Sequence, residues 1–122
     1  MTVAASETSW VETDVSALAA NVAIFRRRLA PGAKLGVVVK ANAYGHGAEL
    51  TSRAVLAAGA DWLIVNDARE ALALREVGLE APIYVCGPVP PGAAEVIVAA
   101  RARLVVYDAA TIRALDSAGR AG

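Results

Sequence analysis

The sequence predicts an α/β fold in which helices cover a parallel sheet. Short, continuous apolar runs rich in β-branched residues alternate with longer segments whose apolar residues recur at helical spacing. These pairs of strand and helix repeat roughly every 20 to 25 residues, as expected for βαβ units. Two architectures have this pattern: a small doubly wound sheet, and part of a (β/α)8 barrel, which typically needs about 250 residues. No Gly-x-Gly-x-x-Gly turn follows the first buried strand to favour a dinucleotide-binding fold.

The first elements are predicted from alternation and capping. Residues 1–9 are small and polar, and we expect them to be disordered, while residues 10–14 alternate in character and predict a short strand. Asp14 or Ser16 can cap the helix that follows, and Pro31 with Gly32 ends it. Four apolar residues at helical spacing predict its buried stripe: Leu18, Val22, Phe25 and Leu29.

Three consecutive arginines, residues 26–28, lie near the end of this first helix. Cations at a helix C-terminus complement the helix dipole. We therefore expect the arginine run to form a solvated face of the helix.

The following elements alternate between strand and helix. Strands are expected at residues 37–39, 62–65, 82–86 and 103–107, and helices at 48–58, 67–77, 93–101 and beyond 108. Asp67 and Glu70 have the spacing of a capping box. Gly78 then ends that helix, and Asp108 is expected to cap the last one.

Composition excludes several classes of function. The 122 residues carry 12 basic and 12 acidic side chains and are 57% hydrophobic, which suits one globular domain without a nucleic-acid or membrane-surface role. Cys86 is the single cysteine and His46 the single histidine, so neither an internal disulfide nor a zinc site is expected. The N-terminus lacks the pattern of a signal peptide, and no apolar run is long enough to span a membrane. A cytoplasmic protein is the expectation.

The most informative stretch begins with the strand at residues 37–39, whose apolar run predicts burial on both faces, and ends at Lys40. Lysine is rarely buried without a partner. The small and turn-forming residues 41–47 follow, with the hydroxyl of Tyr44 among them. A lysine at the carboxyl end of a strand, next to a loop with a tyrosine, is the layout of a barrel active site. The alternative is a lysine whose side chain merely reaches solvent.

Residues 38–47, Val-Val-Lys-Ala-Asn-Ala-Tyr-Gly-His-Gly, resemble the pyridoxal-phosphate attachment motif of alanine racemases without a gap. Residues 70–75 and Gly78 also resemble that family at the matching place. The resemblance extends from about residue 10 to the end and favours the barrel. It implies that residues 10–122 form the N-terminal part of a (β/α)8 TIM-like barrel domain. In the family a C-terminal β domain follows the barrel, and we expect that domain to be absent here.

The resemblance also implies roles for individual residues. Lys40 would bind pyridoxal 5'-phosphate covalently and act as one of two catalytic bases, the one facing the D-isomer. Tyr44 would lie against the cofactor with its hydroxyl toward the phosphate. His46 and Asn42 are expected to shape the loop, and Cys86 to be a small buried side chain. The second base would come from the missing domain across a homodimer interface.

The activity implied is interconversion of L- and D-alanine, which supplies D-alanine for peptidoglycan. As an N-terminal fragment, the 122-residue chain is expected to have weak or no activity by itself. Asn66 stands where the family would have Ala or Thr, and an amide there could change the pocket. A racemase for serine or for several amino acids, and a non-catalytic barrel protein that binds the same cofactor, stay open as alternatives.

Overall fold

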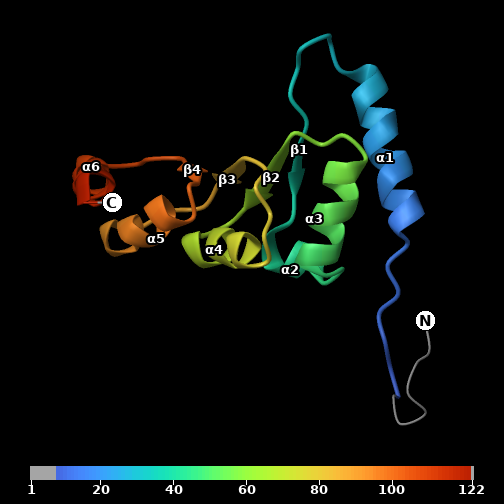
Figure 1. Ribbon diagram of the computed structural model, residues 1–122, viewed down its shortest axis with the longest axis horizontal. Coiled ribbons are helices and arrows are strands. Elements are labelled where there is room, and N and C mark those ends of the chain that lie inside the picture. The colour runs from blue at the N-terminus through green and yellow to red at the C-terminus, as the bar shows by residue number, and fades with distance from the viewer. Residues whose placement is uncertain (1–7, 122) are drawn as a thin grey trace.

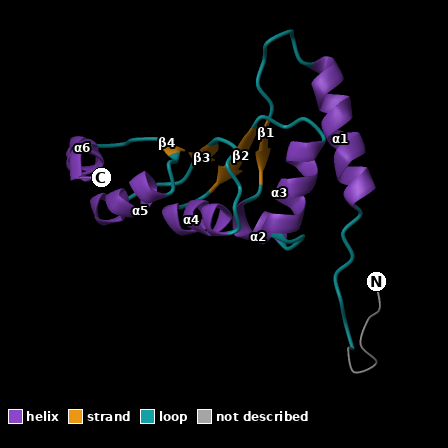
Figure 2. Cartoon of the chain, in the orientation of Figure 1, coloured by secondary structure: helices purple, strands orange, loops and turns teal. Residues whose placement is uncertain are grey.

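The computed structural model describes residues 8–121 and places a four-stranded parallel sheet at the centre of the chain (Figure 1). The strands lie in sequence order, β1-β2-β3-β4, and helices connect them (Figure 2). The elements are α1 (Val15–Arg28), β1 (Gly36–Val38), α2 (Lys40–Tyr44), α3 (Ala48–Ala57), β2 (Trp62–Val65), α4 (Ala68–Glu76), β3 (Ile83–Val85), a 3-10 turn (Pro91–Ala93), α5 (Ala94–Ala99), β4 (Arg103–Leu104) and α6 (Ala109–Ala121).

The hydrophobic core lies between one face of the sheet and the helices. Alternate residues of β2 and β3 are fully buried there, against apolar side chains of α3, α4 and α5. The sheet residues are Leu63, Val65, Ile83 and Val85. The opposite face of the sheet is only partly covered, and Val38 is 39% exposed. The prediction that the strand before Lys40 is buried on both faces is therefore wrong for the described residues, because no second layer covers that face.

The segment before α1 is the clearest departure from the predicted elements. Residues 10–14 form no strand, and Trp10 and Val11 are 57% and 67% exposed. Alternation alone predicted a strand, but no other strand of the described chain lies beside this segment to pair with it. The capping prediction is confirmed, since the Asp14 carboxylate accepts hydrogen bonds from the amides of Ser16 and Ala17.

Later boundaries differ from the predictions by a few residues. The last strand, expected at 103–107, is two residues long, although the Val105 amide still donates to Val85 O at 3.2 Å. Asp108 caps α6 as expected, accepting from the Thr111 amide at 2.7 Å, and this bond lowers the pKa of its carboxyl. The expected disorder of residues 1–9 falls largely outside the described residues. Within 8–121, no helix is both long and apolar enough to cross a membrane.

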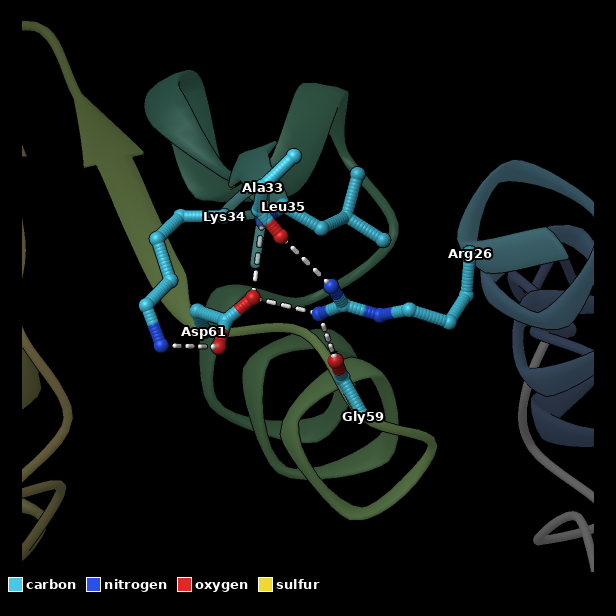
Figure 3. A network of polar contacts seen from close by, with 6 residues as sticks. All are labelled: Arg26, Ala33, Lys34, Leu35, Gly59 and Asp61. Atoms are coloured by element: carbon cyan, nitrogen blue, oxygen red, sulfur yellow. Dashed lines mark hydrogen bonds and ion pairs between the residues drawn. The ribbon is translucent and has the colours of Figure 1, made fainter. Parts of the chain in front are cut away.

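The amino-terminal edge of the sheet carries a network of ion pairs and hydrogen bonds centred on Asp61 (Figure 3). Its carboxylate pairs with Arg26 and Lys34 and accepts from the Leu35 amide at 2.8 Å. Arg26 also donates to Gly59 O at 2.5 Å and to a second backbone oxygen nearby. Arg26 therefore connects α1 to the segments that lead into β1 and β2, and the prediction of a solvated face is wrong for this member of the arginine run.

Candidate active site

Lys40 lies at the carboxyl edge of the sheet, immediately after β1. The residue before it, Val39, is 1% exposed, and its amide donates to Ile64 O at 2.8 Å, which extends the pairing of β1 with β2. Lys40 itself is partly buried. Its ammonium forms no hydrogen bond or ion pair with any residue from 8 to 121. The predicted position at the carboxyl end of a strand is confirmed.

The residues after Lys40 form a left-handed turn within α2. Ala41, Asn42, Ala43 and Tyr44 all have φ between 52° and 55°. An L-residue in this conformation costs about 1–2 kcal/mol, so the four together store on the order of 5 kcal/mol. Such strain persists only where surrounding contacts over-determine it, and it is typical of functional sites.

Hydrogen bonds within the loop hold this turn. The Ala43 amide donates to Val39 O at 2.9 Å, and the Gly47 amide donates to Asn42 O at 3.0 Å. The Asn42 side chain accepts from the Ala48 amide at 2.8 Å and so bonds the first turn of α3. The prediction that Asn42 shapes the loop is confirmed.

The other polar side chains of the loop face outward. Tyr44 is 63% exposed, so its ring is not packed into the core and its hydroxyl is accessible. His46 is exposed and contributes through its backbone oxygen, which accepts from the Thr13 hydroxyl at 3.0 Å. No side-chain hydrogen bond of His46 is formed within residues 8–121, so the expected loop-fixing role rests on its main chain.

The end of β2 lies beside the Lys40 loop and is joined to it by Glu70. One carboxylate oxygen of Glu70 accepts from the Asn66 amide, and the other accepts from the Ala41 amide, each at 2.7 Å. Asp67 caps α4 by accepting from the amides of Arg69 and Glu70. The predicted capping box is therefore half formed, since Glu70 bonds elsewhere. Sequence reasoning missed this link because Glu70 had the spacing of an ordinary cap.

Asn66 occupies the place where the sequence analysis expected a smaller residue. Its backbone oxygen accepts from the Gly87 amide at 3.0 Å, and a Cβ at Gly87 would lie 2.8 Å from Asn66 Oδ1. The same Cβ would lie closer still to the Asn66 backbone oxygen, so glycine at position 87 is required by the close approach of the two backbones, whatever side chain position 66 carries.

The arrangement fits a cofactor with a reactive aldehyde. A lysine amine without a polar partner can condense with an aldehyde, and an exposed tyrosine hydroxyl in the following loop can donate to a phosphate. No group of three or more His, Cys, Asp or Glu side chains among residues 8–121 is arranged to hold a metal ion. The lysine and the tyrosine present here are chemically compatible with a cofactor that carries an aldehyde and a phosphate.

Comparison with known protein families identifies this layout. Residues 13–122 match the family model described as "Alanine racemase, N-terminal domain". The chain belongs to the alanine racemase family. The barrel expected from the resemblance is likewise supported by structure, since the parallel sheet and its helices match the N-terminal part of alanine racemase barrels.

Individual relatives give the extent of the similarity. The alanine racemase of Symbiobacterium thermophilum is 41% identical over 112 residues, covering 92% of this chain and 29% of the relative. The crystal structure of alanine racemase from Bacillus anthracis with bound L-Ala-P superposes with a TM-score of 0.84 at 34% identity, over 93% of this chain and 29% of that one. The Streptomyces coelicolor enzyme gives 0.75 at 43% identity, over 86% and 29%. The chain thus spans less than a third of the length of these alanine racemases.

Proposed function

We propose that this chain supplies the lysine-bearing part of a pyridoxal-phosphate-dependent site that interconverts L- and D-alanine. The observation that carries the proposal is Lys40: a partly buried lysine at the carboxyl end of a strand in a parallel sheet, whose amine has no polar partner among the described residues. Its place in a chain of the alanine racemase family supports this chemistry.

Two residues of the chain have roles in the proposal. Lys40 Nζ holds the cofactor covalently and, when free, takes the α-proton of the amino acid or returns it on the face of the D-isomer. The Tyr44 hydroxyl donates a hydrogen bond to the cofactor phosphate. When bound, pyridoxal phosphate supplies an electron sink that stabilises the deprotonated α-carbon.

The other parts of the proposal lie outside this chain. Racemisation needs a second proton donor, on the face of the α-carbon opposite to Lys40. We propose that this second base comes from a further domain of a homodimeric partner. We also propose that the complete protein is cytoplasmic and supplies D-alanine for peptidoglycan.

A broader substrate range is a second candidate, favoured by one observation. Asn66 places an exposed amide at the end of β2, next to the backbone that leads from Lys40. An amide there can hydrogen-bond a hydroxyl side chain such as that of serine. Rates with alanine, serine and larger amino acids, measured for Asn66→Ala and for the natural residue in a complete racemase, separate the two candidates.

The direct test uses the fact that the sequence has two lysines, Lys34 and Lys40. The chain is incubated with pyridoxal phosphate, reduced with borohydride and digested, and the label is located by mass spectrometry. We expect the label at Lys40 and its loss in Lys40→Ala. Lys34→Ala should keep the label, because Lys34 is paired with Asp61 at the opposite end of the strands. Equal labelling of the natural chain and Lys40→Ala would contradict the proposal.

A further inference from the structure

Glu70 joins the ends of two neighbouring strands through one carboxylate. The Ala41 amide, which follows β1, donates to Oε1 at 2.7 Å, and the Asn66 amide, which follows β2, donates to Oε2 at 2.7 Å. Ala41 is 29 residues away in sequence. Both bonds have the short length of charge-assisted hydrogen bonds.

Helix capping does not account for this carboxylate. In a capping box Glu70 would reach back to the backbone amide of Asp67. The Asp67 side chain already caps α4 alone, accepting from Arg69 N at 2.9 Å and Glu70 N at 3.1 Å. The Glu70 carboxylate is therefore used to bind the strand ends, and α4 positions it for that purpose.

The Ala41 amide is the group through which this bond reaches Lys40. It belongs to the planar peptide that joins Lys40 to Ala41, so fixing the amide limits rotation at Lys40 and restricts the direction of its side chain. Ala41 is also the first residue of the left-handed turn. A turn in this conformation needs bonds from its surroundings to persist, and Glu70 provides the one at its start from a different βα unit.

We propose that Glu70 is a positioning residue: its carboxylate holds the backbone at Lys40 in register with the end of β2, so that the amine is presented for attachment of the cofactor. The structural part of this statement stands on the two hydrogen bonds. The part about presentation of the amine rests on the function proposed above.

The test compares Glu70→Ala and Glu70→Gln with Glu76→Ala, a matched control on the same helix whose side chain is exposed. Backbone amide exchange is measured by NMR on the chain without cofactor. Loss of a charge-assisted bond is expected to speed exchange of the Ala41 and Asn66 amides about tenfold or more in Glu70→Ala. Glu70→Gln keeps one acceptor oxygen and should give an intermediate rate for one of the two amides. Glu76→Ala, and the core amides of β2 and β3 in every variant, should be unchanged.

A second readout is the rate at which borohydride traps pyridoxal phosphate at Lys40. We expect it to fall about tenfold in Glu70→Ala, because small misplacements of a reacting group carry large rate penalties, and to recover in part in Glu70→Gln. Unchanged exchange at both amides in Glu70→Ala would overturn the inference, and so would faster exchange accompanied by an unaltered trapping rate. If the natural chain itself is not labelled at Lys40, attachment of the cofactor requires parts of the site outside this chain, and amide exchange alone then decides for or against the Glu70 link.

Discussion

The Asp61 carboxylate accepts hydrogen bonds from three groups at the end of the sheet opposite to Lys40. Arg26, Lys34 and the Leu35 amide all bond to its carboxylate. The hydrogen bond from Arg26, followed by that from the Leu35 amide, holds the pKa of this carboxyl well below its ordinary value of 3.8. Residues at this edge of a barrel serve stability, while the carboxyl edge serves chemistry.

The first prediction follows from the sign of that shift. Because the folded-state pKa of Asp61 is lowered, its contribution to stability is complete above the ordinary value of 3.8 and is lost as the pH falls through the folded-state pKa. Asp61→Asn should therefore lower the Tm by several degrees at pH 7, and the gap from the natural chain should narrow steadily in acid below that value. Thermal unfolding followed by circular dichroism measures both.

A matched control for this prediction is Asp116→Asn on α6. Among residues 8–121, Asp116 pairs only with Arg120 one turn away, and both side chains are largely exposed. Surface pairs of this kind contribute about 0.3–0.5 kcal/mol, so the Tm should hardly change. The network contributes little if the Tm difference between Asp61→Asn and the natural chain is as small as that for Asp116→Asn, or if it is the same at all pH values.

The left-handed turn of α2 is the element that sets the direction of the chain after Lys40. Four residues with positive φ are placed in succession, although none of them is glycine. Bonds from Val39, Asn42 and Glu70 surround the turn. The turn is therefore held by hydrogen bonds within the loop and by the one from Glu70, which together offset the unfavourable φ of its alanines.

The second prediction is that glycine at position 41 is at least as stabilising as alanine, the reverse of their usual order in a helix. Ala41 is exposed with φ 52° and ψ 50°, so Ala41→Gly should cause no loss of stability and Ala41→Val should cost about 1–2 kcal/mol. Ala73, exposed in the right-handed helix α4, is the control, where Ala73→Gly should cost about 1 kcal/mol. Denaturant unfolding measures all three. Equal losses for glycine at positions 41 and 73 would contradict a left-handed Ala41.

At the scale of the whole molecule, the order of strands and helices could be predicted from sequence, since apolar runs such as 62–65 alternate with segments of helical period. The left-handed turn could not, because Ala41 and Ala43 are ordinary helix formers with no glycine to signal positive φ. The link from Glu70 to Ala41 depends on two units lying side by side. Residues 10–14 show the same limit, since alternation predicts a strand but does not supply its partner.

The sequence predicted the position of Lys40, but it did not predict the hydrogen bonds that hold the backbone around it. The position of Lys40 at a strand end followed from the pattern, and the exposure of Tyr44 agrees with an accessible hydroxyl. Their roles toward the cofactor stay predictions. The face of the sheet that includes Val38 is only partly covered by the described residues.

The third prediction concerns activity of the chain alone. The proposal takes its second proton donor from outside this chain, and one face of the sheet is only partly covered by residues 8–121. We therefore expect alanine racemisation by the purified chain to be at or near background. Loss of optical activity from L-alanine with added pyridoxal phosphate measures it, with the alanine racemase of Symbiobacterium thermophilum as positive control. Sustained turnover by the chain, absent in Lys40→Ala, would show that the described residues suffice.

The strand order β1-β2-β3-β4 has a consequence for the timing of assembly. Each new strand pairs with the one synthesised just before it, so every unit can dock as soon as it leaves the ribosome, without waiting for distant sequence. Glu70 and Ala41 belong to the first two units. The backbone around Lys40 can thus be set once α4 has emerged, and nascent chains long enough for α4 to have left the ribosome should already protect the Ala41 amide.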